Sequence, residues 1–354
     1  MSVAMPLLMA AQISDRQYPK NIVFIVGDGM GLAHIGLFSE YSESFRTLIR
    51  FPVVGLQKTH SATHLVTDSG AAATAMACGE KTYNSAIGMS ADTTRCKNLF
   101  EYAEEAGKST GLVVTSSLVH ATPGAFVAHQ PFRGFREAIA TDFLGSGLDY
   151  IVGGGLVYFT NRFTDEKDLR KDFEGLGYHV YDYKHMSFKR FLKKDESKEK
   201  VIYFTSHLEP DTRAQGRDYL PKAVAHGLQK LKEQNENGFL MMVEASQIDF
   251  AGHDNDKNYL ITELRDFGEL VDEVFAFARE DGNTLVIITG DHSTGGVSIE
   301  SGKPGKNRVK FSFDTSRHTG DLVPVFAFGP GAELFGGVYD NTRIFYKIRE
   351  VGGF

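Results

Sequence analysis

The sequence of 354 residues contains no tryptophan and only two cysteines, Cys78 and Cys96. Two cysteines can form at most one bridge, so a fold held together by a framework of disulfides is excluded. Cys78 lies in a run of small residues that is typical of a helix, and we expect it to be a buried free thiol. No apolar run reaches the roughly 18 residues that a transmembrane helix needs.

The chain also lacks an excess of basic residues. It has 38 lysines and arginines against 45 acidic residues, which gives a formal net charge of −7. Binding to a phosphate backbone requires a basic surface, so we expect no nucleic-acid-binding surface. A small anionic substrate would need a locally positive site, which metal ions and an arginine could supply.

The first residues contain a short apolar run, Val3 to Ala11. We interpret residues 1–12 as a possible remnant of a secretory signal, although the positively charged segment that normally precedes such a run is missing. We expect the mature protein to be soluble, not a membrane protein, and periplasmic or secreted. Residues 13–354 show no linker or internal repeat, which predicts a single catalytic domain with small loop excursions.

Short apolar runs alternate with helical stretches along the chain. This alternation predicts an α/β fold, a three-layer sandwich whose large, mainly parallel central sheet is flanked by helices. The predicted strands cover residues 21–26, 111–115, 150–153, 201–205, 239–243, 284–289 and 323–328. The clearest predicted helices cover residues 69–77, 221–234, 259–280 and 341–350.

Several metal-binding residue types follow these runs. Asp249 and His253 are four residues apart and could reach one zinc ion from a single turn, with His318 completing the site. A helix-capping role for Asp249 and a surface position for His253 are the alternative. Asp291 and His292 directly follow a predicted strand, and an ordinary turn would explain Asp291 but not His292.

Two further carboxylates end buried runs. Asp28 and Glu244 would each cost several kcal/mol in an apolar setting unless paired or bound to a cation. With the Thr122 hydroxyl as a neutral ligand they suit the preference of Mg²⁺ for oxygen. Use as helix caps is the alternative for each carboxylate.

A hydroxyl and a guanidinium complete the inventory. Ser69 precedes a helix-forming run, so its oxygen would lie at a helix N-terminus, where partial positive charge favours an oxyanion. A simple capping role for Asp68 or Ser69 is the competing explanation. Arg133 offers a planar fork of donors suited to two phosphate oxygens, with solvent exposure as the alternative.

Six motifs, in order along nearly the whole chain, together resemble the alkaline phosphatase family. They are Gly27-Asp-Gly-Met-Gly, Thr67-Asp-Ser69-Gly with Gly79-Glu-Lys-Thr-Tyr-Asn downstream, His120-Ala-Thr122-Pro, Val243-Glu244 leading to Asp249 and His253, Gly290-Asp-His292, and His318-Thr-Gly. The short stretch between His292 and His318 is similar to bacterial forms with a small insertion there, and it leaves open whether the chain forms a homodimer.

The resemblance implies an alkaline phosphatase that hydrolyses phosphate monoesters through a phosphoserine at Ser69, with two zinc ions and one magnesium ion. By the family pattern one zinc is held by Asp249, His253 and His318, and the other by Asp28, Asp291 and His292. Magnesium would take Asp28, Thr122 and Glu244, and Arg133 would clamp the phosphoryl group.

Two positions depart from relatives. His120 stands where some members carry aspartate, which lowers the negative charge beside the magnesium site and is expected to affect its metal preference. Phe250 stands where relatives often place a polar group that contacts phosphate through water, so we expect weaker phosphate binding. Both residues are expected to lie just outside the ligands themselves.

Two alternatives to a phosphomonoesterase stay open at this stage. A phosphodiesterase of the same superfamily would use the same metals, and the width of the pocket cannot be read from sequence. A metal-binding or phosphate-binding protein without turnover belongs to a different class, and the presence of both Ser69 and Arg133 argues against it.

Overall fold

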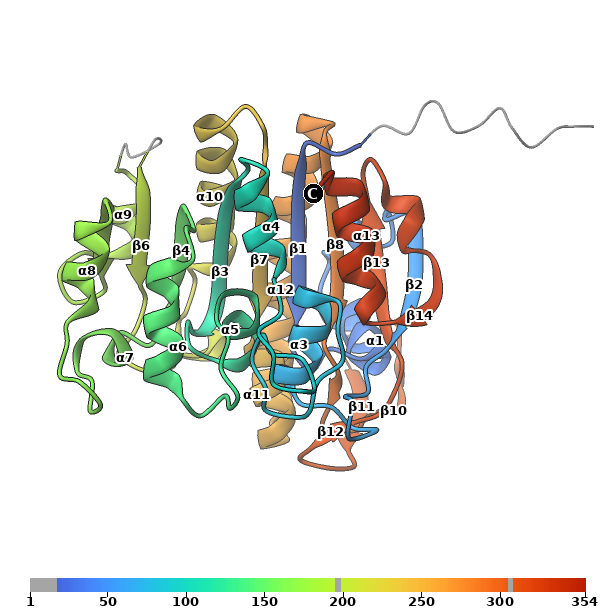
Figure 1. Ribbon diagram of the computed structural model, residues 1–354. Helices are drawn as coiled ribbons and strands as arrows, with labels where there is room; N and C mark the ends of the chain where they lie inside the picture. The colour runs from blue at the N-terminus through green and yellow to red at the C-terminus, as the bar shows by residue number, and fades with distance from the viewer. Residues whose placement is uncertain (1–17, 195–198, 305–307) are drawn as a thin grey trace, which may run out of the picture.

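A computed structural model describes residues 18–194, 199–304 and 308–354, so the apolar run at residues 1–12 lies outside the described residues. A ten-stranded sheet crosses the molecule in the order β14-β2-β13-β8-β1-β7-β3-β4-β6-β5, with helices on both faces (Figure 1). This arrangement confirms the predicted α/β sandwich. The strands of this sheet are β1 (Asn21–Gly27), β2 (Val53–Lys58), β3 (Ser109–Ser117), β4 (Tyr150–Gly154), β5 (Tyr178–Asp182), β6 (Lys200–Phe204), β7 (Phe239–Ala245), β8 (Thr284–Gly290), β13 (Val323–Phe328) and β14 (Gly337–Asp340).

The central strands are buried on both sides. In β1, Ile22 and Phe24 pack into the hydrophobic cluster on one face of the sheet, and Val23 and Ile25 pack into the cluster on the other face. Strands covered on both faces read as continuous apolar runs, which is why the sequence reveals them. β1 pairs in parallel with both β7 and β8, at the centre of the sheet.

Two sets of helices cover the two faces of the sheet. One cluster includes residues of α3 (Ser69–Cys78), α4 (Leu99–Glu105), α5 (Ala121–Val127), α6 (Arg136–Asp142), α7 (Val157–Thr160), α8 (Leu169–Gly175) and α13 (Thr342–Gly352). The other includes residues of α1 (Leu32–Tyr41), α2 (Phe45–Leu48), α9 (Phe188–Phe191), α10 (Leu220–Gln234), α11 (Gln247–Asp254) and α12 (Lys257–Asp281). All four predicted helices are present. Cys78 is a buried free thiol, as predicted.

One predicted strand runs against the rest. The 323–328 run forms β13, which pairs antiparallel with β8 and with β2. The chain between β8 and β13 contains two short antiparallel pairs, β9 (Ser293–Thr294) with β12 (His318–Thr319) and β10 (Val297–Lys303) with β11 (Arg308–Phe313). A parallel return needs a long crossover, usually a helix, and hairpin-like strands return the chain antiparallel instead.

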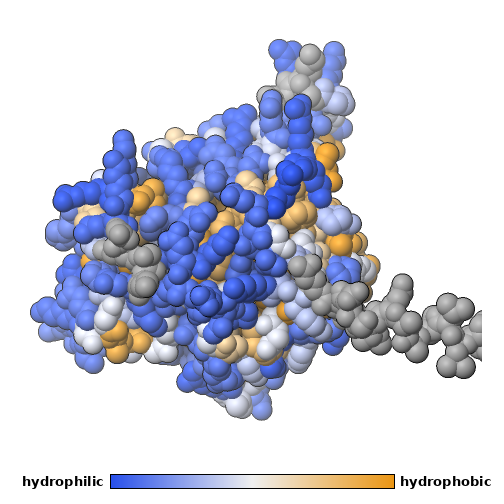
Figure 2. Space-filling view, turned by 90° about the horizontal axis from the view of Figure 1, so that it is seen from above, coloured by the Kyte–Doolittle hydropathy of each residue, from blue (hydrophilic) through white to orange (hydrophobic). Residues whose placement is uncertain are grey.

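The surface of the molecule is largely polar where the view from above Figure 1 shows it. Hydrophilic residues cover most of this side and apolar residues are scattered among them (Figure 2). Among the helices of the described ranges, none combines the length and the apolar character that crossing a bilayer requires.

Candidate active site

The candidate residues gather where the three central strands end. In the pairing register Gly27 of β1 lies opposite Gly290 of β8 and Ala245 of β7. Asp28 and Asp291 therefore follow directly after neighbouring strand ends, and Glu244 is the penultimate residue of β7. The carboxyl edge of a parallel sheet is where α/β proteins place their sites. This edge faces downward in Figure 1, beside α11 and β12.

The first group of possible metal ligands consists of Asp249, His253 and His318, whose ligand atoms all lie within 4.8 Å of one another. The His253 and His318 Nε2 atoms are 3.1 Å apart. His253 Nδ1 lies 2.8 Å from the carbonyl oxygen of Ser316, and His318 Nδ1 lies 2.9 Å from that of Thr67. A carbonyl only accepts, so each Nδ1 carries a proton and donates it. Each Nε2 is then the nitrogen that faces the Asp249 carboxylate, and it is the one that can bind a metal once it carries no proton.

The pKa values of His253 and Asp249 are shifted in the directions that favour a positive charge beside the Asp249 carboxylate. Hydrogen bonding to Asp249 raises the pKa of His253 to about 9. Burial alone would raise the pKa of Asp249, but the His253 hydrogen bond and the charges of the nearby imidazoles lower it overall. Without metal the group therefore holds a proton on His253 at neutral pH. Metal binding would have to displace that proton.

The second group is completely buried and consists of Asp28, Asp291 and His292. His292 Nε2 lies 3.1 Å from an Asp291 oxygen and 3.6 Å from an Asp28 oxygen. Burial and the negative charge of Asp291 raise the pKa of Asp28 well above its ordinary value. The backbone amides of Gly29 and His292 donate to the other Asp291 oxygen, at 3.0 and 2.9 Å, and so fix the direction of this carboxylate.

The third group consists of Asp28, Glu244 and His120. Burial raises the pKa of Glu244 to about 7, although the nearby hydroxyls of Ser246 and Thr122 lower it. The sequence placed His120 outside the ligands, whereas in the structure one of its ring nitrogens lies within 4.8 Å of an oxygen of each carboxylate. Thr122, the second residue of α5, is fully buried and lies close to Glu244.

Several buried polar atoms without a hydrogen-bond partner among the described residues lie at this site. They include both oxygens of Asp28, one oxygen each of Glu244 and Asp291, the Thr122 hydroxyl and His120 Nδ1. Buried polar groups are normally satisfied, and several unpaired carboxylate oxygens in one place are costly. Cations bound between them would satisfy them, so the donor set fits metal ions of the zinc and magnesium type.

Ser69 lies at the edge of the second group. It is the first residue of α3 and is almost fully buried, and its Oγ is 3.4 Å from His292 Nε2. The helix is capped by Asp68, which accepts from the Ala71 amide at 3.0 Å. Ser69 therefore does not have to cap the helix. Its hydroxyl oxygen lies at the positive end of a helix dipole and beside possible cations.

Arg133 lies in the segment between α5 and α6, and its side chain extends to Asp68 at the start of α3. Its Nη1 donates to Asp68 Oδ2 at 2.9 Å, and its Nη2 lies 3.4 Å from His120 Nε2. The side chain is 27% exposed, so part of the guanidinium remains accessible to a bound anion. All the candidate residues proposed from sequence thus lie in one region.

The sequence missed two contributors. Asp68 was read only as a helix cap, but it also holds Arg133. Thr294 was not considered, yet its buried hydroxyl donates to Asp249 at 2.5 Å and lies 3.1 Å from His292 Nδ1. It connects residues of the first and second groups. Its position two residues after His292 was the available signal.

Phe250 lies beside the third group and is half-buried. Its ring contacts the ring of His120 edge to face, with centroids 5.3 Å apart. The benzyl group offers no hydrogen-bond donor at this position, and the weaker phosphate binding expected from sequence stays a prediction.

Comparison with known proteins shows which sequences this chain is similar to. Residues 19–311 match a family model described as alkaline phosphatase. Alkaline phosphatase 4 of Bacillus subtilis is 30% identical over 97% of this chain and 91% of its own length. Alkaline phosphatase of Escherichia coli K12 is 29% identical over 96% of this chain and 87% of its own.

A solved structure has a closely similar fold. The alkaline phosphatase from the Antarctic bacterium TAB5 is 38% identical, with a TM-score of 0.89 over 96% of this chain and 99% of that one. Variants of that enzyme in which one histidine is replaced by glutamate or aspartate have Mg bound in the site called M3.

Proposed function

The chain belongs to the alkaline phosphatase family, and we propose that it hydrolyses phosphate monoesters by transferring the phosphoryl group to Ser69 and then to water. The position of the Ser69 hydroxyl carries this proposal. It lies at the N-terminus of α3, 3.4 Å from His292 and next in sequence to Asp68, which holds Arg133. A nucleophile, a cluster of metal ligands and an anion-binding guanidinium thus meet at one point.

The residues of the chain would divide the work as follows. Ser69 Oγ gives up its proton to solvent water and attacks phosphorus, the bond from phosphorus to the ester oxygen breaks, and the alcohol leaves with a proton from water. The N-terminus of α3 stabilises the negative serine oxygen. Arg133 binds two nonbridging phosphoryl oxygens through its planar fork. Asp68 keeps the guanidinium in register with Ser69, because it is bonded both to Arg133 and to the first turn of α3. Water then cleaves the phosphoserine and restores the hydroxyl.

Three cation sites support this chemistry. We propose that zinc ions occupy the Asp249, His253 and His318 group and the Asp28, Asp291 and His292 group, and that magnesium occupies the group of Asp28, Thr122 and Glu244. When bound, such ions neutralise the charge of the attacking and leaving oxygens in phosphoryl transfer. The unpaired carboxylate oxygens of the second and third groups support this assignment.

The third group has one feature that bears on its metal. His120 adds an imidazole nitrogen to Asp28 and Glu244. We propose that it corresponds to the histidine replaced in the TAB5 variants that hold Mg in M3. An imidazole suits zinc as well as or better than magnesium, so His120 would shift the preference of this site towards transition metals.

Two broader features complete the proposal. The sheet is continuous across the described residues, which supports one catalytic domain over residues 13–354. We further propose that the protein is periplasmic or secreted, which rests on the apolar run in residues 1–12.

One experiment tests the phosphoserine directly. The zinc-loaded and magnesium-loaded protein is incubated with radioactive inorganic phosphate, quenched in acid and separated by electrophoresis. The label is expected on the protein and on the peptide that contains Ser69, and it should be absent in Ser69→Ala. Label that persists in Ser69→Ala, or turnover of a nitrophenyl monoester by that variant at the normal rate, would contradict the proposal.

A further inference from the structure

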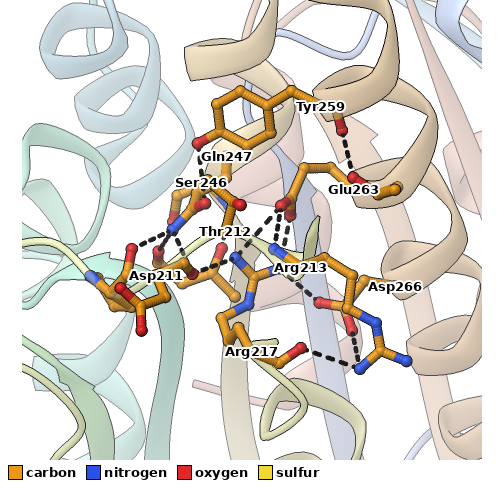
Figure 3. A network of polar contacts seen from close by, with 12 residues as sticks. Asp211, Thr212, Arg213, Arg217, Ser246, Gln247, Tyr259, Glu263 and Asp266 are labelled. Atoms are coloured by element: carbon orange, nitrogen blue, oxygen red, sulfur yellow. Dashed lines mark hydrogen bonds and ion pairs between the residues drawn. The ribbon is translucent and has the colours of Figure 1, made fainter. Parts of the chain in front are cut away.

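The helix that carries Asp249 and His253 is held at its first residue by an unusual set of contacts. Gln247 begins α11 and is 1% exposed. Its Nε2 donates to the carbonyl oxygens of Thr115 at 2.8 Å and Pro210 at 2.9 Å, and lies 3.3 Å from that of Asp211. The hydroxyl of Tyr259 donates to Gln247 Oε1 at 2.8 Å (Figure 3).

These contacts fix the amide completely. Carbonyl oxygens only accept, so the nitrogen of Gln247 must face them and its oxygen must face the tyrosine hydroxyl. Three separate parts of the fold meet at this side chain: the end of β3 at Thr115, the loop at residues 210–211 and the first turn of α12 at Tyr259. No rotation of Gln247 would preserve all the bonds, so the start of α11 has one defined position.

The loop that supplies two of these carbonyls is itself anchored to α12. Arg217 Nη2 donates to Glu263 at 2.5 Å and to Asp266 at 2.7 Å, and all three side chains are at most 3% exposed. Arg217 Nη1 also lies 3.3 Å from the carbonyl oxygen of Asp211, one of the acceptors near Gln247. Because a buried ion pair is expensive to separate, the loop is held firmly against α12.

A second arginine strengthens the same attachment. The backbone amide of Arg213 donates to Glu263 at 2.8 Å, and its guanidinium donates to both oxygens of Glu269 at 2.9 Å. Figure 3 shows this network converging on the loop from α12, with Gln247 on the other side. The contacts thus run without interruption from α12 through the loop to the helix that carries Asp249.

We propose that Gln247 and Tyr259 are positioning residues that set the place of α11 and so align Asp249 and His253 for zinc. Asp249 lies two residues after Gln247 and His253 six residues after it, within one rigid helix of eight residues. Displacement of the first turn would move the carboxylate relative to His318, which comes from β12 and does not move with α11. This inference rests on the proposed function for the role of the zinc ion.

The test measures zinc affinity, with activity as a second readout. Tyr259→Phe removes only the hydroxyl that holds Gln247 Oε1. Gln247→Glu keeps the shape but places an oxygen against the carbonyls. Tyr150→Phe is the matched control, because it removes a buried hydroxyl that donates to the Ala223 carbonyl at 3.0 Å and contacts neither α11 nor the 210–217 loop. Zinc binding is titrated by competition with a chromophoric chelator, and the step lost in His253→Ala identifies the site.

Removal of partners that orient ligands typically costs metal affinity about 10-fold to 100-fold. We expect Tyr259→Phe to weaken the His253-dependent step roughly tenfold and Gln247→Glu nearer a hundredfold. The other zinc step and the Tyr150→Phe protein should be unchanged. Full zinc affinity in Tyr259→Phe, or an equal loss in Tyr150→Phe, would overturn the inference. Should Gln247→Glu fail to fold, Tyr259→Phe decides alone. An unaltered protein that bound no zinc or released no phosphate would instead overturn the proposed function.

Discussion

At the scale of single residues, the candidate site has more buried negative charge than its positive side chains balance. Asp28, Glu244 and Asp291 are fully buried within one region, and the Arg133 guanidinium faces Asp68 instead of them. Their nearest balancing groups are imidazoles. Without further positive charge such a set would be strongly destabilising. The cost is tolerated in proteins where binding of cations offsets it.

The identity of the residue at position 120 should decide which metal activates the enzyme. In His120→Asp a carboxylate oxygen replaces an imidazole nitrogen beside Asp28 and Glu244, and Mg²⁺ prefers oxygen ligands. We expect the concentration of Mg²⁺ that gives half-maximal activation to fall about tenfold, as for other single-ligand changes. It is measured by titrating the zinc-loaded protein with Mg²⁺. His120→Ala, which supplies no new oxygen, serves as the control, and an equal effect in both variants would refute the explanation.

Phe250 should limit the affinity for phosphate. In Phe250→Lys an ammonium group would extend from α11 towards the bound anion. A hydrogen bond to a charged group at a half-exposed site contributes about 1 kcal/mol, or roughly a fivefold lower Kd for inorganic phosphate. Inhibition of hydrolysis by phosphate gives this constant. Phe250→Leu controls for loss of the ring, and unchanged or weaker phosphate binding in the lysine variant would show that the position does not face the anion.

At the scale of helices and strands, the sequence predicted the strands that are continuous apolar runs and missed the half-exposed strands. The runs that became β1, β7 and β8 are buried on both faces and were predicted with nearly correct ends. The sequence missed β2 and β5, in which exposed and buried residues are mixed, and β14, which has no buried residue. All three strands lie towards the two margins of the sheet. The reversal of β13 was also missed, because strand direction depends on the connection and not on the strand itself.

The candidate site was more predictable than the fold around it. Aspartates and histidines directly after strand ends indicate a common edge, which is why all the proposed ligands came together. The two supports at Asp68 and Thr294 depend on contacts between distant segments, which spacing does not reveal. Gln247 was likewise invisible, since its partners at Thr115, Pro210 and Tyr259 meet it only in the folded chain.

The packing of α4 against β3 should make stability depend on pH. Burial raises the pKa of Glu104 to about 7, while its hydrogen bond from Thr110 lowers it. The folded state therefore binds more protons than the unfolded state between pH 4.5 and 7, and stability falls as the pH rises through this window. After allowance for solvent screening at this half-buried carboxyl, the loss is about 1 kcal/mol.

Glu104→Gln should remove this dependence. At pH 8 the variant is expected to melt about 2 °C above the unaltered protein, and at pH 4.5 the two should melt together. Thermal unfolding followed by circular dichroism at both pH values measures the difference. Glu105→Gln, on the exposed side of the same helix, serves as the control. A gain in Tm that is the same at both pH values would show that the charge of Glu104 is not its cause.

At the scale of the whole molecule, the sheet acts as a frame that brings distant segments to one edge. The candidate ligands from Asp28 to His318 come from the ends of β1, β7 and β8, from α5 and α11, and from the short strand β12. The two hydrophobic clusters hold these elements in place on opposite faces of the sheet. Function therefore depends on packing between segments that are distant in the sequence. Removal of the metal ions by a chelator should abolish hydrolysis and leave the sheet folded.

The central claim is that three groups of side chains around Ser69 hold cations. Anomalous X-ray diffraction at the zinc absorption edge, on crystals of the protein loaded with zinc and magnesium, tests this claim most directly. The account predicts one strong peak among Asp249, His253 and His318 and another among Asp28, Asp291 and His292, with a third ion, zinc or magnesium, beside Glu244. Crystals of the loaded, active protein that showed no anomalous peak at either histidine group would contradict it.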